Sequence, residues 1–414
     1  MISMRRLAFM LLVVLAVAAF GATRFLLRSI DRPLEARSAV QEPSTRSVVL
    51  LAQFGYGAPG FSGYIQFLDA QSLEVLGRIR SFDPATQVKA VPGGKKLLIS
   101  QGDVDGGGCC SLYLLDLSDQ SMCRLIGPLA DFAPSADGKF SFSQQGDTPV
   151  FIHDLDTGQP SGQIDAGVYT YGFPPSPNGK WLIGVKQFSL DGKLGLTLID
   201  LQKRAIAGEA PITITAGAWI GESFWGLNSD DGPLVLRKLS PPDLLPTDVP
   251  LIGALPTMNL AVESARMISA GKNLLLYARI NPWEIDSSRE DIGRDTPGGA
   301  FLIDPTSGKN LQHLVPQADI ADMASSNDGT TVYAIVAPDE KPVRLLAIDA
   351  KTGSVSKERT LEQFGDGRWS LTTAELNVAV IPHGEISPAV CRKHEATPWL
   401  TEVPASATPS PTAP

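Results

Sequence analysis

One pattern recurs seven times along this chain: a short apolar strand that ends at a polar residue and then at a turn. The strands cover residues 64–69, 112–116, 150–154, 196–200, 234–238, 301–304 and 345–349, and end at Asp69, Asp116, Asp154, Asp200, Lys238, Asp304 and Asp349. Their last residues lie 47, 38, 46, 38, 66 and 45 positions apart, a quasi-period of about 47 residues. Self-similarity at roughly 40–50 residues is typical of a β-propeller with one four-stranded blade per repeat. The pattern therefore predicts an all-β, seven-bladed β-propeller.

A second pattern supports the same fold. Turns rich in glycine, often Gly-Lys, come directly before apolar residues, at 92–95, 135–139, 176–180, 270–273 and 326–329. Asp-Gly and Asn-Gly tolerate the positive φ angles that a tight hairpin turn needs, so each turn marks the step from the first to the second strand of a blade. The strand-ending aspartates are expected to accept hydrogen bonds from backbone N–H groups just downstream. We therefore interpret them as turn formers and not as functional residues.

The two ends of the repeat array complement each other. Residues 47–52 resemble a strand that precedes the first aspartate-ended strand, whereas 369–372 and 376–381 resemble strands that have no such partner. We therefore expect one blade to be closed by strands from both termini. The interval of 66 residues leaves room for an eighth blade. An insertion between Arg279 and Gly299 is the simpler explanation, which favours seven.

The N-terminus has the pattern of a secretory signal peptide or a signal anchor. Arg5 and Arg6 precede an uncharged run of 17 residues, 7–23, which is also just long enough to span a bilayer. Arginines after the run would favour a cytoplasmic location, but we favour export. The prediction is an extracytoplasmic protein, periplasmic or secreted, and anchored to the inner membrane if the segment is not cleaved. The predicted domains are a signal peptide or anchor, a linker, the propeller, and an extension with a Pro/Ser/Thr/Ala-rich end, at 1–27, 28–46, 47–384 and 385–414.

Charge argues against nucleic acid as a partner. The formal net charge is −9, from 44 acidic and 35 basic residues, and no dense Lys/Arg run follows the N-terminus. Proteins that bind nucleic acid usually present a basic patch.

Four cysteines are few for a fold held by disulfides: Cys109, Cys110, Cys123 and Cys391. Adjacent cysteines rarely bond to each other. We therefore predict that one of the adjacent pair, Cys110, bonds to Cys123 and ties neighbouring strands of one blade.

Any binding function is expected on the loops that do not repeat. The longest, 280–298, carries an aromatic residue beside several carboxylates, which suit a cation, a sugar or a basic patch of a partner: Trp283, Glu284, Asp286, Glu290 and Asp291. A solvated insertion is the alternative interpretation. Segment 54–61 interleaves aromatic residues, including Tyr56 and Phe61, with glycines. It suits an exposed contact patch, or a loop that packs over its own blade. The expected partner is a protein or a small ligand on the propeller face.

No catalytic or metal-binding motif was found. Segment 103–108 lacks the third acidic position and the distal glutamate of a calcium loop. Cys391 and His394 do not form a zinc or haem pattern, and His153, inside an apolar strand, is expected to be structural. There is no nucleophile elbow or dinucleotide fingerprint. We therefore expect no metal and no cofactor, and the catalytic residues are unknown. Paired carboxylates that meet only in space remain open.

Two stretches resemble a known group of proteins. Ser-Pro-Asn-Gly-Lys-Trp-Leu at 176–182 and Ile-His-Asp-Leu-Asp-Thr-Gly at 152–158 resemble repeats of YVTN-type, quinoprotein amine dehydrogenase heavy-chain-like bacterial propellers. The WD40 dipeptides are missing. This resemblance implies the fold, because it lies in structural turns. In that family the heavy chain holds a small subunit that carries the redox cofactor.

The sequence as a whole leaves three functional hypotheses. The one we favour is a non-enzymatic binding scaffold. The second, implied by the resemblance, is an amine dehydrogenase heavy-chain-like subunit that holds a small redox partner, and the third is a hydrolase or lyase acting at the channel mouth.

Overall fold

The computed structural model describes residues 45–391 with several gaps. The segments outside the description within this range are 56–61, 82–84, 102–110, 126–130, 145–148, 166–174, 188–193, 229–233, 253–264, 279–297, 317, 337–341 and 362–367. All described residues belong to one compact unit, Thr45–Pro414.

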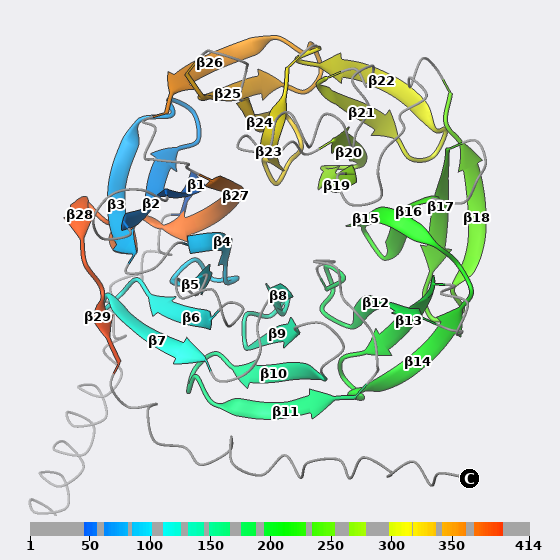
Figure 1. The fold of residues 1–414 in the computed structure, drawn as a ribbon, viewed down its shortest axis with the longest axis horizontal. Coiled ribbons are helices and arrows are strands. Elements are labelled where there is room, and N and C mark those ends of the chain that lie inside the picture. The colour runs from blue at the N-terminus through cyan, green and yellow to red at the C-terminus, as the bar shows by residue number, and fades with distance from the viewer. Residues whose placement is uncertain are drawn as a thin grey trace, which may run out of the picture. The chain divides into compact units, whose positions relative to one another are not determined.

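The described strands form seven sheets, which follow one another around a ring (Figure 1). We number these blades along the chain. Blade 1 contains β27 (Arg368–Asn377), β1 (Thr45–Gly55), β2 (Ser62–Asp69), β3 (Val75–Ser81) and β28 (Gly384–Ile386). Blade 2 contains β4 (Ala85–Ala90), β5 (Lys96–Gln101), β6 (Ser111–Asp116), β7 (Ser121–Leu125) and β29 (Ala389–Val390). Blade 3 contains β8 (Asp131–Pro134), β9 (Phe140–Gln144), β10 (Val150–Asp154) and β11 (Pro160–Ile164).

Blades 5, 6 and 7 repeat the four-stranded order of blade 3, and three strands are described in blade 4. Blade 4 contains β12 (Trp181–Gln187), β13 (Leu194–Asp200) and β14 (Ala205–Ala210). Blade 5 contains β15 (Ile214–Ile220), β16 (Ser223–Asn228), β17 (Val235–Ser240) and β18 (Leu245–Pro250). Blade 6 contains β19 (Ala265–Ala270), β20 (Asn273–Ala278), β21 (Ala300–Asp304) and β22 (Lys309–Leu314), and blade 7 contains β23 (Ile320–Ser325), β24 (Thr331–Val336), β25 (Arg344–Asp349) and β26 (Val355–Thr360). Among the described residues the only helix is the short 3₁₀ turn η1 (Val378–Val380). The prediction of an all-β, seven-bladed propeller is confirmed.

Blade 1 combines strands from both ends of the described chain. β1 pairs antiparallel with β2 on one side and with β27 on the other, in a register that runs from Thr45↔Asn377 to Phe54↔Arg368. β27, from the C-terminal part of the array, is therefore the inner edge strand of a sheet whose other long strands come from the N-terminal part (Figure 1).

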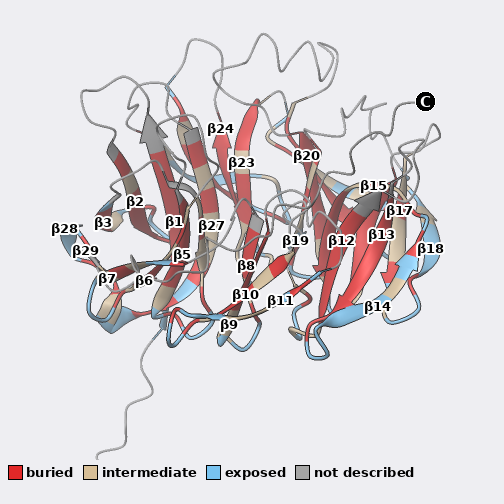
Figure 2. Cartoon of the chain, turned by 60° about the horizontal axis from the view of Figure 1, so that its bottom comes forward, coloured by how far each residue is buried: buried red, intermediate tan, exposed pale blue. Residues whose placement is uncertain are grey.

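The core lies between neighbouring blades. The second strands β9, β16, β20 and β24 are buried at every residue after the first. A continuous apolar run such as Leu274, Leu275 and Leu276 of β20 is the sequence pattern that such strands produce (Figure 2). Between blades 7 and 1, for example, Tyr333 and Ile335 belong to the same apolar cluster as Trp369 and Leu371. The outer strands are more exposed. Apolar packing between neighbouring blades therefore contributes to the stability of the fold.

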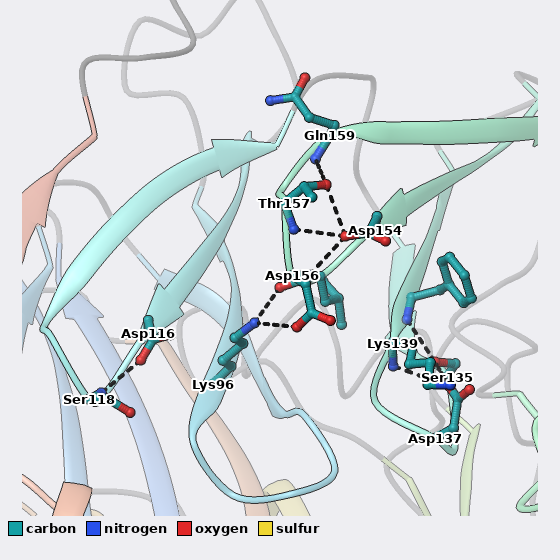
Figure 3. Close-up of polar contacts among 12 residues, drawn as sticks. Lys96, Asp116, Ser118, Ser135, Asp137, Lys139, Asp154, Asp156, Thr157 and Gln159 are labelled. Carbon is teal, nitrogen blue, oxygen red and sulfur yellow. Dashed lines mark hydrogen bonds and ion pairs between the residues drawn. The ribbon is translucent and has the colours of Figure 1, made fainter.

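The strand-ending aspartates form turns as predicted. Asp154 accepts hydrogen bonds from the backbone N–H groups of Asp156 (3.0 Å) and Thr157 (2.7 Å), and from the Thr157 hydroxyl (2.9 Å), as Figure 3 shows. These bonds, that of the Thr157 backbone above all, lower the pKa of Asp154 because they favour the ionised carboxylate. Equivalent backbone bonds are made by Asp69, Asp116, Asp200, Asp304 and Asp349.

The Ser-x-Asp-Gly turns are held in a similar way. The Ser135 hydroxyl donates to Asp137 Oδ1 (2.7 Å), which also accepts from the N–H of Lys139 (3.1 Å; Figure 3). The Ser135 bond is the main reason why the pKa of Asp137 is lowered. In blade 4, Asn178 makes the same two contacts, with the Ser176 hydroxyl (2.6 Å) and the N–H of Lys180 (3.0 Å). The chain thus contains a charged and a neutral version of one turn.

This pair leads to a prediction about acid stability. Because the pKa of Asp137 is lower in the folded chain than its ordinary value of 3.8, its contribution is present above that value and is lost as pH falls through the folded pKa. Asp137→Asn keeps the accepting oxygen. We expect its unfolding free energy to match that of the wild type within about 0.5 kcal/mol at pH 7, and to fall less on acidification to about pH 3. Urea unfolding at both pH values measures this. The matched reverse change, Asn178→Asp, should increase acid sensitivity, and unchanged acid sensitivity in both variants would contradict the interpretation.

Some turn glycines are needed for a second reason besides their φ angle. Gly329 has φ +70°, and a Cβ added there would lie 2.4 Å from the carbonyl carbon of Ala270 in the neighbouring blade. At Gly138, an added Cβ would lie 2.7 Å from the carbonyl oxygen of Pro92, again in the neighbouring blade. The sequence predicts the positive φ, and the structure adds a close approach between the turns of adjacent blades.

The C-terminal end corrects the predicted disulfide. Cys123 of β7 bonds to Cys391, with a Cα–Cα distance of 4.8 Å, so the predicted Cys110–Cys123 pairing is wrong. The reason is that β29 pairs parallel with β7 (Val390↔Met122), which places Cys391 beside Cys123. Cys109 and Cys110 lie outside the described residues. β28 extends past residue 384, and β29 lies wholly beyond it. Described strands therefore reach into the segment predicted as an extension, 385–414.

Candidate functional site

The predicted site residues lie outside the described residues. Trp283, Glu284, Asp286, Glu290 and Asp291 belong to segment 279–297 between β20 and β21, and Tyr56 and Phe61 belong to segment 56–61 between β1 and β2. The structure does describe the strands that flank both segments. These strands form the bases of the two segments.

At the β20 end of segment 279–297, the chain is fixed by a carboxylate shared between three blades. Tyr277, only 2% exposed, donates its hydroxyl to Asp322 Oδ1 on β23 (3.1 Å). The other oxygen, Oδ2, accepts the backbone N–H of Leu371 on β27 (2.8 Å). Asp322 is half-buried, and its two oxygens link its own blade 7 to blades 6 and 1. This contact joins residues 45 and 49 positions apart, and no local motif predicts it.

The β21 end is fixed separately. His313 Nε2 donates to the carbonyl oxygen of Gly298 (3.0 Å), and its ring stacks on Phe301, with the ring centres 4.3 Å apart. The N–H of Gly299 donates to the carbonyl oxygen of Ala318 (2.8 Å). Gly299 has φ +89°, and an added Cβ would lie 2.5 Å from the carbonyl oxygen of Leu314. The sequence assigns His313 no role, because its partner is a backbone group.

The base of segment 56–61 is a regular hairpin. β1 and β2 remain paired as far as Gly55↔Ser62, directly beside the segment. On the same two strands, the Gln66 Nε2 group of β2 donates to Gln53 Oε1 of β1 (3.5 Å), and both side chains are buried. The paired strands therefore fix the two ends of this segment against each other.

The seam between blades 7 and 1 carries further polar contacts. The Tyr333 hydroxyl donates to the carbonyl oxygen of Ala70 (2.8 Å), and the Thr373 hydroxyl donates to that of Ser325 (2.6 Å). Burial, and then the negative charge of Asp69, raises the pKa of Tyr333 to about 12. The hydroxyl therefore stays protonated at physiological pH and continues to donate.

Charged side chains on other inner strands donate hydrogen bonds to carbonyl oxygens of the propeller backbone. Lys89 of β4 donates to the carbonyl oxygen of Phe132 and lies over its ring, 5.0 Å from the centre. Arg266 of β19 donates to the carbonyl oxygen of Ala265 (2.9 Å). In the part of the chain that the structure describes, no three His, Cys, Asp or Glu side chains gather as a metal site requires. The same part contains no helix with the length and apolar character that crossing a membrane requires.

Comparison with known proteins supports the fold. No protein-family model matches the chain, and no curated protein matches it in sequence. Among solved structures, the dihydro-heme d1 dehydrogenase NirN in complex with DHE is 15% identical, with a TM-score of 0.50 over 80% of this chain and 76% of that one. The computationally designed Ika8 protein is 12% identical (TM-score 0.47, 80% of this chain and 97% of that one), and apo AztD from Citrobacter koseri is also 12% identical (TM-score 0.46, 80% and 98%).

At such low identity, the likeness to NirN bears on the fold alone. The resemblance to YVTN-type and amine dehydrogenase heavy-chain-like propellers therefore stays a prediction. What the seven sheets and this likeness establish together is that the chain folds as a β-propeller.

Proposed function

We propose that this protein is an exported or membrane-anchored propeller that acts as a binding scaffold, with segments 279–297 and 56–61 as its contact surface for a protein or small ligand. The observation that carries the proposal is the fixation of both ends of segment 279–297, by Tyr277 with Asp322 on one side and by His313 with Gly298 on the other. A rigid scaffold that presents non-repeating loops is the usual basis of recognition on repeat folds.

The disulfide supports export. Bonds of this kind form and persist in oxidising compartments and are rare in the cytosol. The bond between Cys123 and Cys391 therefore suits a periplasmic or secreted protein, with residues 1–27 as its signal or anchor.

We further propose that β27 closes the ring by pairing with β1, and that this closure supports the site. Asp322 binds Tyr277 at the base of segment 279–297 and Leu371 of β27 with its two oxygens. Loss of β27 from blade 1 would remove one of these partners, and so would loosen the base of the segment.

Binding variants test the proposal. Full-length wild type, Trp283→Ala and Lys351→Ala are used as bait in extracts of the cells that produce the protein. Lys351 is an exposed turn residue after β25 and serves as the control. If Trp283 is an anchor, its truncation weakens binding of the captured partner by about 30-fold or more, whereas Lys351→Ala leaves it unchanged. Equal affinity of all three baits would contradict the assigned surface.

The capture experiment and an activity assay separate the alternatives. A small coloured partner that copurifies would support the amine dehydrogenase heavy-chain-like hypothesis over the scaffold hypothesis. Turnover of a hydrolase or lyase substrate by the purified chain alone would support the enzymatic one.

A further inference from the structure

The chain after β27 leaves the inner side of blade 1 and continues along the outer edges of blades 1 and 2 (Figure 1). We name residues 382–391 the strap. Its strand β28 pairs parallel with β3 (Gly384↔Gly77 to Ile386↔Ile79), and β29 pairs parallel with β7. The N–H of Cys391 donates to the carbonyl oxygen of Met122 (2.9 Å), and the disulfide to Cys123 ends the strap.

The two C-terminal attachments differ in strength. β27 pairs with β1 along ten positions, buries Trp369 and Leu371, and is bonded to Asp322. The strap has three paired positions in β28 and two in β29. Pro382 and Pro388 are buried, whereas Gly384, Glu385 and Ala389 are exposed. A short parallel addition of this kind gives little stability by itself. The strap therefore depends on its covalent bond much more than β27 does.

The outer edge of β3 is shaped for the strap. A Cβ added at Gly77 would lie 1.9 Å from the carbonyl oxygen of Pro382. Gly208 occupies the equivalent position beside the bulge of blade 4, and an added Cβ there would meet nothing closer than 3.5 Å. Ile386 packs against the core cluster that includes Ile79 and Ile381. The edge thus accepts an extended backbone in close contact, together with an apolar side chain.

We propose that the Cys123–Cys391 disulfide is a redox latch for this strap. In the oxidised protein the strap covers the outer edges of β3 and β7. Reduction by a dithiol breaks the S–S bond, each Sγ gains one proton and one electron, and the dithiol closes to its own disulfide. The strap then leaves, β27 keeps its place beside β1, and the outer edges of β3 and β7 lose their paired strands.

Hydrogen exchange followed by mass spectrometry tests the latch on the full-length protein. Three samples are compared: oxidised wild type, wild type with dithiothreitol, and Cys123→Ser/Cys391→Ser. We expect amide exchange in the strap, β3 and β7 to become faster by about tenfold or more in the second and third samples, and exchange in β1 and β27 to stay unchanged. The double variant keeps Cys109 and Cys110, so agreement between the two samples assigns the effect to this bond.

A second variant separates covalent from non-covalent attachment. Gly77→Ala, with the disulfide intact, should speed exchange at β28 and β3 but not at β29 and β7. An equal increase along the whole strap would contradict a latch at Cys391. The proposal is also overturned if removal of the bond leaves the strap protected, or if β27 and β1 exchange faster to the same extent as the strap. Alkylation of Cys123 and Cys391 in the folded oxidised protein would overturn it too.

Discussion

Gly329→Ala is expected to lower the free energy of unfolding by about 2–5 kcal/mol, as the sum of two effects. The residue has φ +70°, a conformation that costs a side-chain-bearing residue about 1–2 kcal/mol. The added Cβ would also lie 2.4 Å from backbone atoms of Ala270 and Gly271 in the next blade, and such overlap typically costs about 1–3 kcal/mol. Backbone atoms cannot turn away as a side chain can, so the two blades have to separate.

A matched glycine isolates the contact between blades. Gly221 has φ +57°, but an added Cβ there would meet nothing within 4 Å. Gly221→Ala should therefore cost only the backbone strain of about 1–2 kcal/mol. Urea unfolding of both variants at one pH gives the difference between them. Equal losses would mean that turn stacking does not contribute to the cohesion of the ring.

Asp322→Ala is expected to cost about 2–4 kcal/mol, because it removes the acceptor of two buried or half-buried donors at once. The donors are the Tyr277 hydroxyl (3.1 Å) and the N–H of Leu371 (2.8 Å), which come from blades 6 and 1. Loss of these two hydrogen bonds should also loosen the base of segment 279–297. Asp322→Ala should therefore weaken partner binding to that segment more than a variant at a remote site with the same loss of stability does.

A double-mutant cycle with Tyr277→Phe measures this contact directly. If Tyr277 and Asp322 act together, their coupling free energy is about 0.5–3 kcal/mol. Asp322→Asn is the control, because it keeps one oxygen acceptor and nearly the same volume. A coupling free energy near zero, or equal losses for Asn and Ala, would show that the side chain contributes only by filling space.

The repeating part of the fold was predictable because its causes are local. The apolar strand that ends at Asp154 is followed by Thr157 and Gly158, so the residues that form its turn lie within a few positions of one another. The hydrogen bonds of Asp154 confirm this turn. Seven such strands predict seven blades. Lys238 in place of aspartate did not remove blade 5, since β17 still pairs with β16 and β18.

The non-local contacts were not predictable in the same way. Cys391 lies 268 positions from Cys123, and only the parallel pairing of β29 with β7 brings the two together. Spacing along the sequence favours Cys110 instead, because Cys110 lies much nearer to Cys123. The same limit applies to Asp322 and His313, whose partners lie on other strands or on the backbone. The predicted contact residues, such as Trp283 and Tyr56, lie outside the described residues, so their role stays a prediction.

The proposed closure of the ring by β27 is tested most directly by cross-linking across β1 and β27. Ser47 faces Glu375 in this pairing, the two are 328 positions apart in sequence, and the Ser47 hydroxyl donates to the glutamate. Ser47→Cys/Glu375→Cys should form a disulfide that joins the N-terminal and C-terminal peptides in mass spectrometry. Ser47→Cys/Thr373→Cys, two residues out of register, should form much less of it. The absence of the first cross-link, or equal yields in the two variants, would contradict closure of the ring by β27.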